Sequence, residues 1–267
     1  MQSLPQLIIF DLDGTLAESK MPLDAEMAAL LGELLIHTKV AVISGASFAQ
    51  FQVQFLGHLH FPKNRQVPGQ PDPMTNLSLL PADASSFYVY NPADARGATT
   101  GGWVTVYQNL LSSEEKGMIR AAVSKVAGTM YFEKIYGEQL EDRGSQMAFS
   151  ALGQQAPIEV KKNWDADHKI REGMVARLRP LLPGFEMNIG GMTSFDITKT
   201  GIDKEYGINQ LVKYFSIPKS AAVYVGDAIF PGGNDYAAVT AGVPTHQVAT
   251  VSDTKDFIRE VLRGIIK

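Results

Sequence analysis

The stretch LIIFDLDGTLAES, residues 7–19, places two carboxylates, Asp11 and Asp13, directly after four apolar residues. An uninterrupted apolar run is typical of a strand that is buried on both faces of a parallel sheet. In open α/β sheets, ligands bind beyond the carboxyl ends of the strands. The stretch therefore predicts that the first strand of the fold ends in a functional site.

Short apolar runs alternate with longer amphipathic stretches at both ends of the chain. This alternation is the pattern of a parallel sheet covered by helices, so we predict an α/β fold with a Rossmann-like parallel sheet. We expect strands at residues 7–10, 40–43 and 222–225, and helices at residues 22–36, around 208–215 and around 257–265.

The middle of the chain has a different pattern, which predicts a helix-plus-sheet unit inserted into the first domain. A loop is expected at 62–76, and residues 87–90 and 103–107 read as a hairpin around a Gly-rich connection. Further expected elements are helices at 114–127 and 166–179, and strands at 145–152 and 185–197, the last interrupted by Gly190 and Gly191. We thus predict a core of residues 1–108 and 199–267 with an inserted α/β cap at 109–198.

Composition narrows the class of protein. The chain has 267 residues, 45% of them hydrophobic, which is enough for a sizeable core. Its net charge of -4 offers no basic excess for nucleic acid, although small phosphorylated ligands remain open. The absence of cysteine excludes disulfides, thiolate nucleophiles and zinc–thiolate sites. With neither a signal-peptide pattern nor a run of ~18 apolar residues, we expect a cytoplasmic protein without a membrane partner.

Three of the expected strands end in polar residues that suit one task. Neighbouring carboxylates raise each other's pKa unless a cation lies between them, and Mg²⁺ prefers oxygen ligands and bridges carboxylates to phosphate. The sequence therefore predicts Mg²⁺ as the cofactor. Its candidate ligands are Asp11, Asp13, Asp227, Asn234 and Asp235.

A carboxylate can also attack phosphorus, which divides a difficult phosphoryl transfer into two easier steps. The transferred group then needs positive charge and hydrogen-bond donors on its oxygens. Ser44, at the end of the second strand, is the candidate donor. Lys204 is the first candidate for the positively charged side chain that binds the phosphoryl group. Lys199 is the alternative, since spacing alone does not decide between the two lysines.

Four motifs in order carry a family resemblance: DLDGT (11–15), SG (44–45), Lys204, and GD with ND (226–235). The set resembles the haloacid-dehalogenase-like superfamily of aspartate-nucleophile phosphotransferases. The resemblance implies that Asp11 is the nucleophile and a metal ligand, and that Asp13 is the general acid and base and offers its backbone carbonyl to the metal. It assigns phosphoryl binding to Ser44 and Lys204, and metal binding to Asp227 with Asn234 and Asp235 in or near its shell.

A finer resemblance lies within the superfamily members that carry a large α/β cap. The segments NIGGMTSFDITKTGIDKEYG (188–207) and GDAIFPGGND (226–235) look like those of the eukaryotic-type phosphomannomutases. This resemblance implies that Gly45, Arg143, Ser194 and Asp196 contact a small phosphorylated substrate. Mutases of this type also dimerise through the cap, which leaves an oligomer of this kind open.

One departure from that pattern decides between two activities. The mutases hold the distal phosphate of a sugar bisphosphate with several cap arginines, and the second of these falls at Gln154. Because a phosphatase needs only one phosphate site and a water molecule, we predict Mg²⁺-dependent hydrolysis of a small phosphate monoester, a phosphosugar, through an aspartyl-phosphate. A phosphomannomutase-type mutase is the first alternative, and a catalytically degenerate phospholigand-binding protein is the second.

Overall fold

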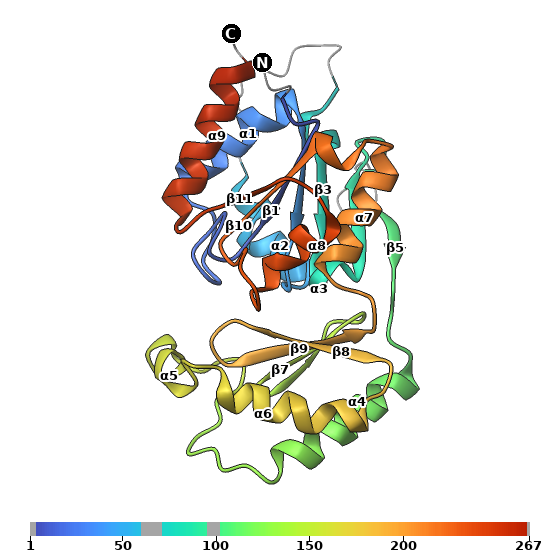
Figure 1. Ribbon diagram of the computed structural model, residues 1–267, viewed down its shortest axis with the longest axis vertical. Coiled ribbons are helices and arrows are strands. Elements are labelled where there is room, and N and C mark those ends of the chain that lie inside the picture. Colours follow the sequence, from blue (N-terminus) through green and yellow to red (C-terminus); the bar gives the residue numbers. More distant parts are fainter. Residues whose placement is uncertain (1–3, 60–70, 95–101, 266–267) are drawn as a thin grey trace. The chain divides into compact units, whose positions relative to one another are not determined.

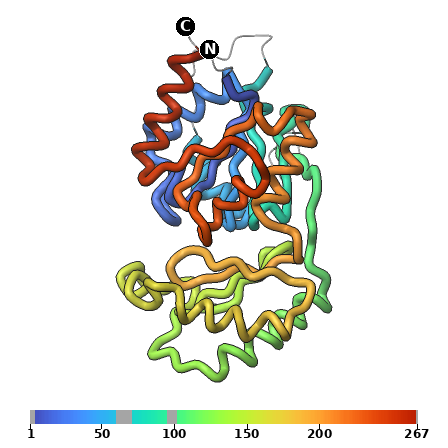
Figure 2. The backbone as a smooth tube through the Cα atoms, viewed as in Figure 1, coloured from blue at the N-terminus to red at the C-terminus, as the bar shows by residue number. Residues whose placement is uncertain are grey.

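The computed structural model describes residues 4–59, 71–94 and 102–265, which form two compact units (Figure 1). The core unit comprises Met1–Gln108 and Asp203–Lys267, and the inserted unit comprises Asn109–Ile202. Figure 2 shows the inserted unit as one continuous stretch of chain, coloured green to orange, which in sequence separates the two segments of the core unit. It ends four residues later than expected, because Ile202 folds back on the last strand: Ile202 N donates to Lys199 O over 3.0 Å.

The core unit contains a sheet of seven strands in the order β11-β10-β1-β2-β3-β4-β5. Strands β11 to β3 are parallel, whereas β4 pairs antiparallel with both β3 and β5. This confirms the expected parallel sheet and places the expected hairpin at its edge. The bounds are β1 Leu7–Asp11, β2 Lys39–Ile43, β3 Leu77–Leu80, β4 Ser86–Tyr90, β5 Trp103–Gln108, β10 Ala222–Gly226 and β11 Thr245–Gln247.

Helices cover both faces of this sheet, and each face has its own apolar core. One core joins Ile8 and Phe10 of β1 to helices α1 (Ala25–His37), α2 (Phe48–Gln54) and α9 (Val251–Ile265). The other joins Leu7 and Ile9 to α3 (Pro81–Ala84), α7 (Lys204–Phe215) and α8 (Ala237–Ala241). Alternate residues of β1 therefore enter opposite cores, which explains why its apolar run has no polar interruption.

A left-handed turn follows β3. Ala82, Asp83 and Ala84 have φ of +52°, +52° and +63°, a conformation that is unfavourable for residues other than glycine. Neighbouring backbone holds the turn, since Ala82 N donates to Ala46 O and Asp83 N donates to Ser44 O. The turn therefore ties the end of β3 to the loop that follows β2.

The inserted unit contains a four-stranded antiparallel sheet in the order β6-β7-β9-β8. The segment expected as one interrupted strand at 185–197 is two antiparallel strands, with a turn at Gly191, where φ is +58°. One face of the sheet packs against helices, and the opposite face carries polar residues. The elements are α4 Ser113–Ala127, β6 Leu140–Asp142, β7 Met147–Ser150, α5 Ile158–Trp164, α6 Lys169–Leu178, β8 Phe185–Gly190 and β9 Ser194–Lys199.

Among the described helices, none combines the length and the apolar character that crossing a membrane requires.

The close contact between α7 and the left-handed turn gives a test of the fold. A Cβ atom at Gly207 would lie 2.3 Å from the Cβ of Ala84 and 3.1 Å from a methyl of Leu80. We expect Gly207→Ala to lower the free energy of unfolding by roughly 1–3 kcal/mol, because the packed turn cannot recede. Urea unfolding measures this change.

Gly264→Ala in α9 is the matched control, because the added Cβ would approach only the end of the Leu4 side chain, at 3.4 Å. Since alanine favours a helix over glycine by about 1 kcal/mol, this control should not lose stability. Equal effects of the two substitutions would contradict the close contact at Gly207.

Candidate active site

A buried ammonium group lies at the centre of the site. Lys204, the first residue of α7, has 3% of its side chain exposed and donates to Asp11 Oδ1 over 2.7 Å and to Asp235 Oδ1 over 2.6 Å. Asp203 caps the helix, because its side chain accepts a hydrogen bond from Tyr206 N. The cap fixes the start of α7, and thereby the point from which the Lys204 side chain extends.

Asp235 is fully buried, and protein donors occupy both of its oxygens. Oδ1 accepts from Lys204 and from the hydroxyl of Tyr224 over 2.6 Å, and Oδ2 accepts from Ala228 N over 3.0 Å. Gly226 has no space for a side chain, since a Cβ there would lie 2.3 Å from Asp235 Oδ2. Asp235 therefore orients Lys204, and fewer of its lone pairs are open to a metal than sequence reasoning assumed.

Sequence reasoning missed Tyr224. Its position in β10 counted only as one apolar residue of a buried strand. The hydroxyl nevertheless lies 3.3 Å from Lys204 Nζ as well as 2.6 Å from Asp235. The only sequence signal for such a role was a tyrosine two residues before the Gly-Asp pair. Without the fold, this tyrosine could not be distinguished from an ordinary core residue.

Asp227 lies against the first loop of the chain. A Cβ at Gly14 would be 2.6 Å from Asp227 Oδ2, and Gly14 has φ of +85°. Both observations explain why glycine occupies this position. Oxygen atoms of Asp11, Asp227 and Asp235 lie within 4.8 Å of one another.

The charges of this group are unbalanced, because Lys204 faces three carboxylates. Burial raises the pKa of Asp11 well above its usual range, against the opposing effect of Lys204. Burial, with the charge of Asp235, also raises the pKa of Asp227. Burial alone would lower the pKa of Lys204, but the charges of Asp11 and Asp235 outweigh it and raise that pKa. Excess negative charge on oxygen donors is the environment that a hard divalent cation such as Mg²⁺ fits, with Asp11 and Asp227 as its best-placed carboxylates.

Asp13 lies beyond the end of β1 and belongs to a separate hydrogen-bonded group. Its Oδ1 accepts from Lys20 N over 2.7 Å and from Gln54 Nε2 over 2.9 Å. The strand end thus gives the two aspartates of the opening stretch different partners: Asp11 pairs with an ammonium group, and Asp13 accepts from amides.

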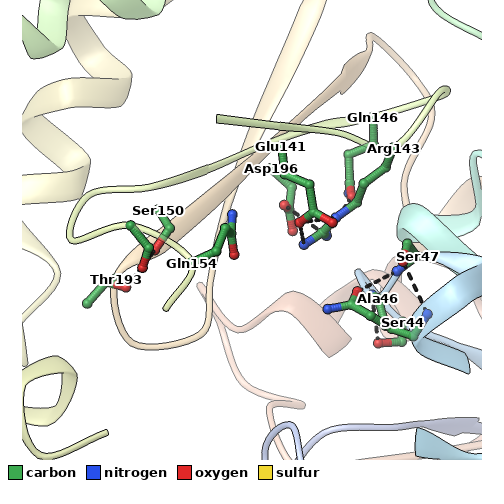
Figure 3. A network of polar contacts seen from close by, with 12 residues as sticks. Ser44, Ala46, Ser47, Glu141, Arg143, Gln146, Ser150, Gln154, Thr193 and Asp196 are labelled. Atoms are coloured by element: carbon green, nitrogen blue, oxygen red, sulfur yellow. Dashed lines mark hydrogen bonds and ion pairs between the residues drawn. The ribbon is translucent and has the colours of Figure 1, made fainter. Parts of the chain in front are cut away.

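Ser44 follows β2 at the same edge of the sheet, since Ile43 pairs with Asp11 in the parallel register. Its Oγ accepts from Ala46 N over 3.1 Å, which leaves its hydroxyl hydrogen able to point elsewhere (Figure 3). Gly45 lies in the loop between Ser44 and α2 and makes polar contacts of its own. Asn234 begins the short turn that carries Asp235.

The two candidate lysines have different partners. Lys199 Nζ lies 3.1 Å from Glu115 Oε1 within the inserted unit, whereas Lys204 contacts Asp11 in the core unit. Lys199 was an alternative because it lies only five residues before Lys204. It is the last residue of β9, and its side chain contacts the helix α4.

In the inserted unit, Arg143 lies among acidic and amide side chains (Figure 3). Its Nε and Nη2 donate to Glu141 Oε2 over 3.0 and 2.7 Å, and its Nη1 donates to Gln146 Oε1 over 3.0 Å. Nη1 also lies 3.6 Å from Asp196 Oδ1. The guanidinium is therefore already engaged by two carboxylates, a feature that the sequence did not reveal.

Ser194 and Asp196 lie on the polar face of the inserted sheet, as their alternation predicts, because Phe195 between them is fully buried in the core. The turn before Ser194 is held by Arg171, another residue that sequence reasoning missed. Arg171 is 1% exposed and donates to Gly191 O over 2.8 Å and to the carboxylate of Asp165 over 2.7 Å.

Comparisons with known proteins place this geometry in context. Residues 104–264 match the family model of eukaryotic phosphomannomutase. The chain is 24% identical to a probable phosphomannomutase of Caenorhabditis elegans, covering 97% of this chain and 96% of that one. It is 25% identical to phosphomannomutase 1 of Homo sapiens, covering 96% and 91%. Its fold is similar to that of the IMP-nucleotidase of Plasmodium falciparum, with a TM-score of 0.71, 16% identity and coverage of 98% and 69%.

The unbalanced carboxylates predict a pH-dependent stabilisation by Mg²⁺. Raised pKa values mean that Asp11 and Asp227 hold protons to higher pH in the folded protein than in the unfolded chain, whose aspartates ionise near their usual value of 3.8. Without metal, ionising them therefore costs stability as the pH rises through the raised values. Metal requires the ionised form, so the stabilisation by Mg²⁺ should be largest at neutral pH and should decline as the pH falls through those values.

Thermal unfolding with and without Mg²⁺ across a pH series measures this effect. At a metal concentration a hundredfold above Kd the stabilisation should be about 2.7 kcal/mol. Asp227→Asn should remove most of it, whereas Asp167→Asn, an exposed aspartate of the inserted unit, should retain it. A shift independent of pH, or one that survives in Asp227→Asn, would speak against a cation at these carboxylates.

Proposed function

The chain belongs to the eukaryotic phosphomannomutase family of the haloacid-dehalogenase-like superfamily, and from that premise we propose that it transfers the phosphoryl group of a small phosphosugar through Asp11. The observation that carries this proposal is the ammonium of Lys204, which bridges the buried carboxylates of Asp11 and Asp235. A nucleophilic carboxylate needs a nearby fixed positive charge when a dianionic phosphoryl group approaches it. Lys204 is placed to supply that charge.

The first chemical step forms a bond between an Asp11 oxygen and phosphorus and breaks the bond from phosphorus to the sugar oxygen. Asp13 gives its proton to the departing sugar oxygen, so the sugar leaves as a neutral hydroxyl. In the second step an incoming hydroxyl attacks the aspartyl-phosphate and returns a proton to Asp13, which restores both carboxyl groups. Water as the attacking group gives hydrolysis, and a second hydroxyl of a phosphosugar gives a mutase.

Other residues of the core unit would bind and orient the phosphoryl group. The Ser44 hydroxyl and Lys204 Nζ are its proposed donors, and Asp235 with Tyr224 would keep Lys204 in place. Mg²⁺, held by Asp11, Asp227 and the backbone carbonyl of Asp13, would supply the charge that neutralises the phosphoryl oxygens. Asn234 would support the loop that carries Asp235.

Family membership favours the mutase over the hydrolase that the sequence analysis predicts. In a mutase, the polar face of the inserted unit would bind the second phosphate, with Arg143 exchanging its partners Glu141 and Asp196 for phosphate oxygens. Ser194 and Asp196 would contact the sugar hydroxyls. We therefore take the phosphomannomutase-type mutase as the first candidate.

Hydrolysis remains the second candidate, on the observation that Arg143 is engaged by two carboxylates and Gln154 stands where a second arginine is expected. A neutral amide binds a dianionic phosphate less strongly than a bidentate guanidinium does. Binding of one phosphate by the core unit is sufficient for a phosphatase. The two candidates share the chemistry at Asp11 and differ in what attacks the aspartyl-phosphate.

Replacing the nucleophile tests the shared chemistry. Asp11→Asn keeps the shape of the side chain but removes the attacking carboxylate, so Mg²⁺-dependent turnover of phosphosugars should fall by at least about 10⁴-fold. Steady-state assays measure the loss, and circular dichroism checks that the fold is retained. Asp167→Asn serves as the control and should keep full activity. Substantial turnover by Asp11→Asn would mean that another group attacks phosphorus.

Product analysis separates the two candidates. With mannose 1-phosphate or glucose 1-phosphate and a catalytic amount of the 1,6-bisphosphate, we expect hexose 6-phosphate to accumulate without matching release of inorganic phosphate. Phosphorus NMR distinguishes these products in one sample. Stoichiometric release of inorganic phosphate would instead contradict the mutase and identify the protein as a hydrolase.

A further inference from the structure

Among residues 4–59, 71–94 and 102–265, the partners of the Asp13 carboxyl group all contact one of its oxygens, Oδ1. Oδ1 accepts two N–H groups, Lys20 N over 2.7 Å and Gln54 Nε2 over 2.9 Å. Both are amide donors that cannot accept a proton in return. Both donors therefore hold Oδ1, and Oδ2 is the oxygen that the side chain can turn to a ligand.

The chain is folded locally so that both donors reach Asp13. Lys20 has φ of +60°, in the left-handed region, where a residue other than glycine is strained by roughly 1 kcal/mol or more. Gln54, the last residue of α2, is 8% exposed, and its backbone oxygen accepts from Leu23 N over 3.0 Å. The loop after β1 is thus tied to α2 by its backbone on one side and through Asp13 on the other.

Gln54 differs from the neighbouring glutamines of its helix. Gln50 belongs to the capping box of α2, where its side chain accepts from Ser47 N, and Gln52 is exposed. The amide of Gln54 instead leaves the helix end and donates to a carboxylate 41 residues earlier in the chain. This buried amide contacts Asp13, the proposed general acid and base, so it can fix the orientation of that carboxyl group as well as pack against it.

We propose that Gln54 is a positioning residue that fixes the Asp13 carboxyl so that Oδ2 faces the reacting oxygen. This inference rests on the proposed function. As the bond from phosphorus to the sugar oxygen breaks, the Oδ2–H bond breaks and its proton passes to that oxygen. As the next hydroxyl attacks the aspartyl-phosphate, its proton passes to Oδ2. Gln54 neither gains nor loses a proton in either step.

The test uses leaving groups that differ in their need for a proton. An alkoxide that leaves from a hexose 1-phosphate requires protonation, whereas p-nitrophenolate leaves without it. Gln54→Met keeps the length of the side chain but removes the donor. We expect kcat on the sugar phosphate to fall by roughly 10–100-fold with KM little changed. The pre-steady-state burst of p-nitrophenolate reports the first step alone, which needs no proton for this leaving group, and its rate should fall by less than about threefold.

Gln52→Met, on the exposed side of the same helix, is the matched control and should leave both substrates unaffected. If Gln54→Met does not fold, Gln54→Asn keeps an amide but shortens its reach, and the same selective loss is expected. An equal loss in the p-nitrophenolate burst rate and in kcat on the sugar phosphate would overturn the proposal, because a merely structural defect does not distinguish leaving groups. No change in either rate would overturn it as well.

The same assay separates this inference from the function on which it rests. If the unsubstituted protein turns over no sugar phosphate, the proposed function fails, and the role of Gln54 fails with it. If the unsubstituted protein is active and Gln54→Met shows no selectivity between the leaving groups, only the role of Gln54 fails.

Discussion

The contact of the Lys204 ammonium with Asp11 and Asp235 is the interaction on which the rest of the site depends. It joins three chain segments: the end of β1, the start of α7 and the turn after β10. Lys204 and Asp11 are 193 residues apart in sequence. A buried charge of either sign is costly without its partner, so the three segments stabilise one another's position. The chain enters the inserted unit after Gln108 and returns to the core unit at Asp203, directly before Lys204.

The parallel arrangement of the central strands allows that contact to form. Because β10, β1 and β2 run in the same direction, their carboxyl ends lie at one edge and bring Asp227, Asp11 and Ser44 to neighbouring positions. The glycines at this edge are needed for close approach: Gly14 admits Asp227, and Gly226 admits Asp235. The negative charge gathered there exceeds what Lys204 can balance, which is the physical basis for expecting a cation.

The inserted unit shows a different use of charge. Its arginine at position 143 is surrounded by Glu141, Asp196 and Gln146, so its charge is compensated within the unit. In the core unit, three carboxylates surround the single ammonium group of Lys204. In the inserted unit, the guanidinium of Arg143 contacts two carboxylates. The proposed phosphoryl chemistry uses residues of the core unit. In the proposed mutase, Arg143 of the inserted unit would have to exchange its carboxylate partners for a second phosphate.

The sequence by itself determined the α/β class, the strands that end in Asp11, Ser44 and Asp227, and the hairpin of residues 87–90 and 103–107, because these depend on local patterns of apolar residues, glycine and motif order. Strand β3, Tyr224, Gln54 and the partners of Arg143 were decided only by the tertiary structure. A short apolar run, a core-like tyrosine and an ordinary helix glutamine carry no local mark of function. Their roles arise from contacts between segments far apart in sequence, which the spacing of residues along the chain cannot specify.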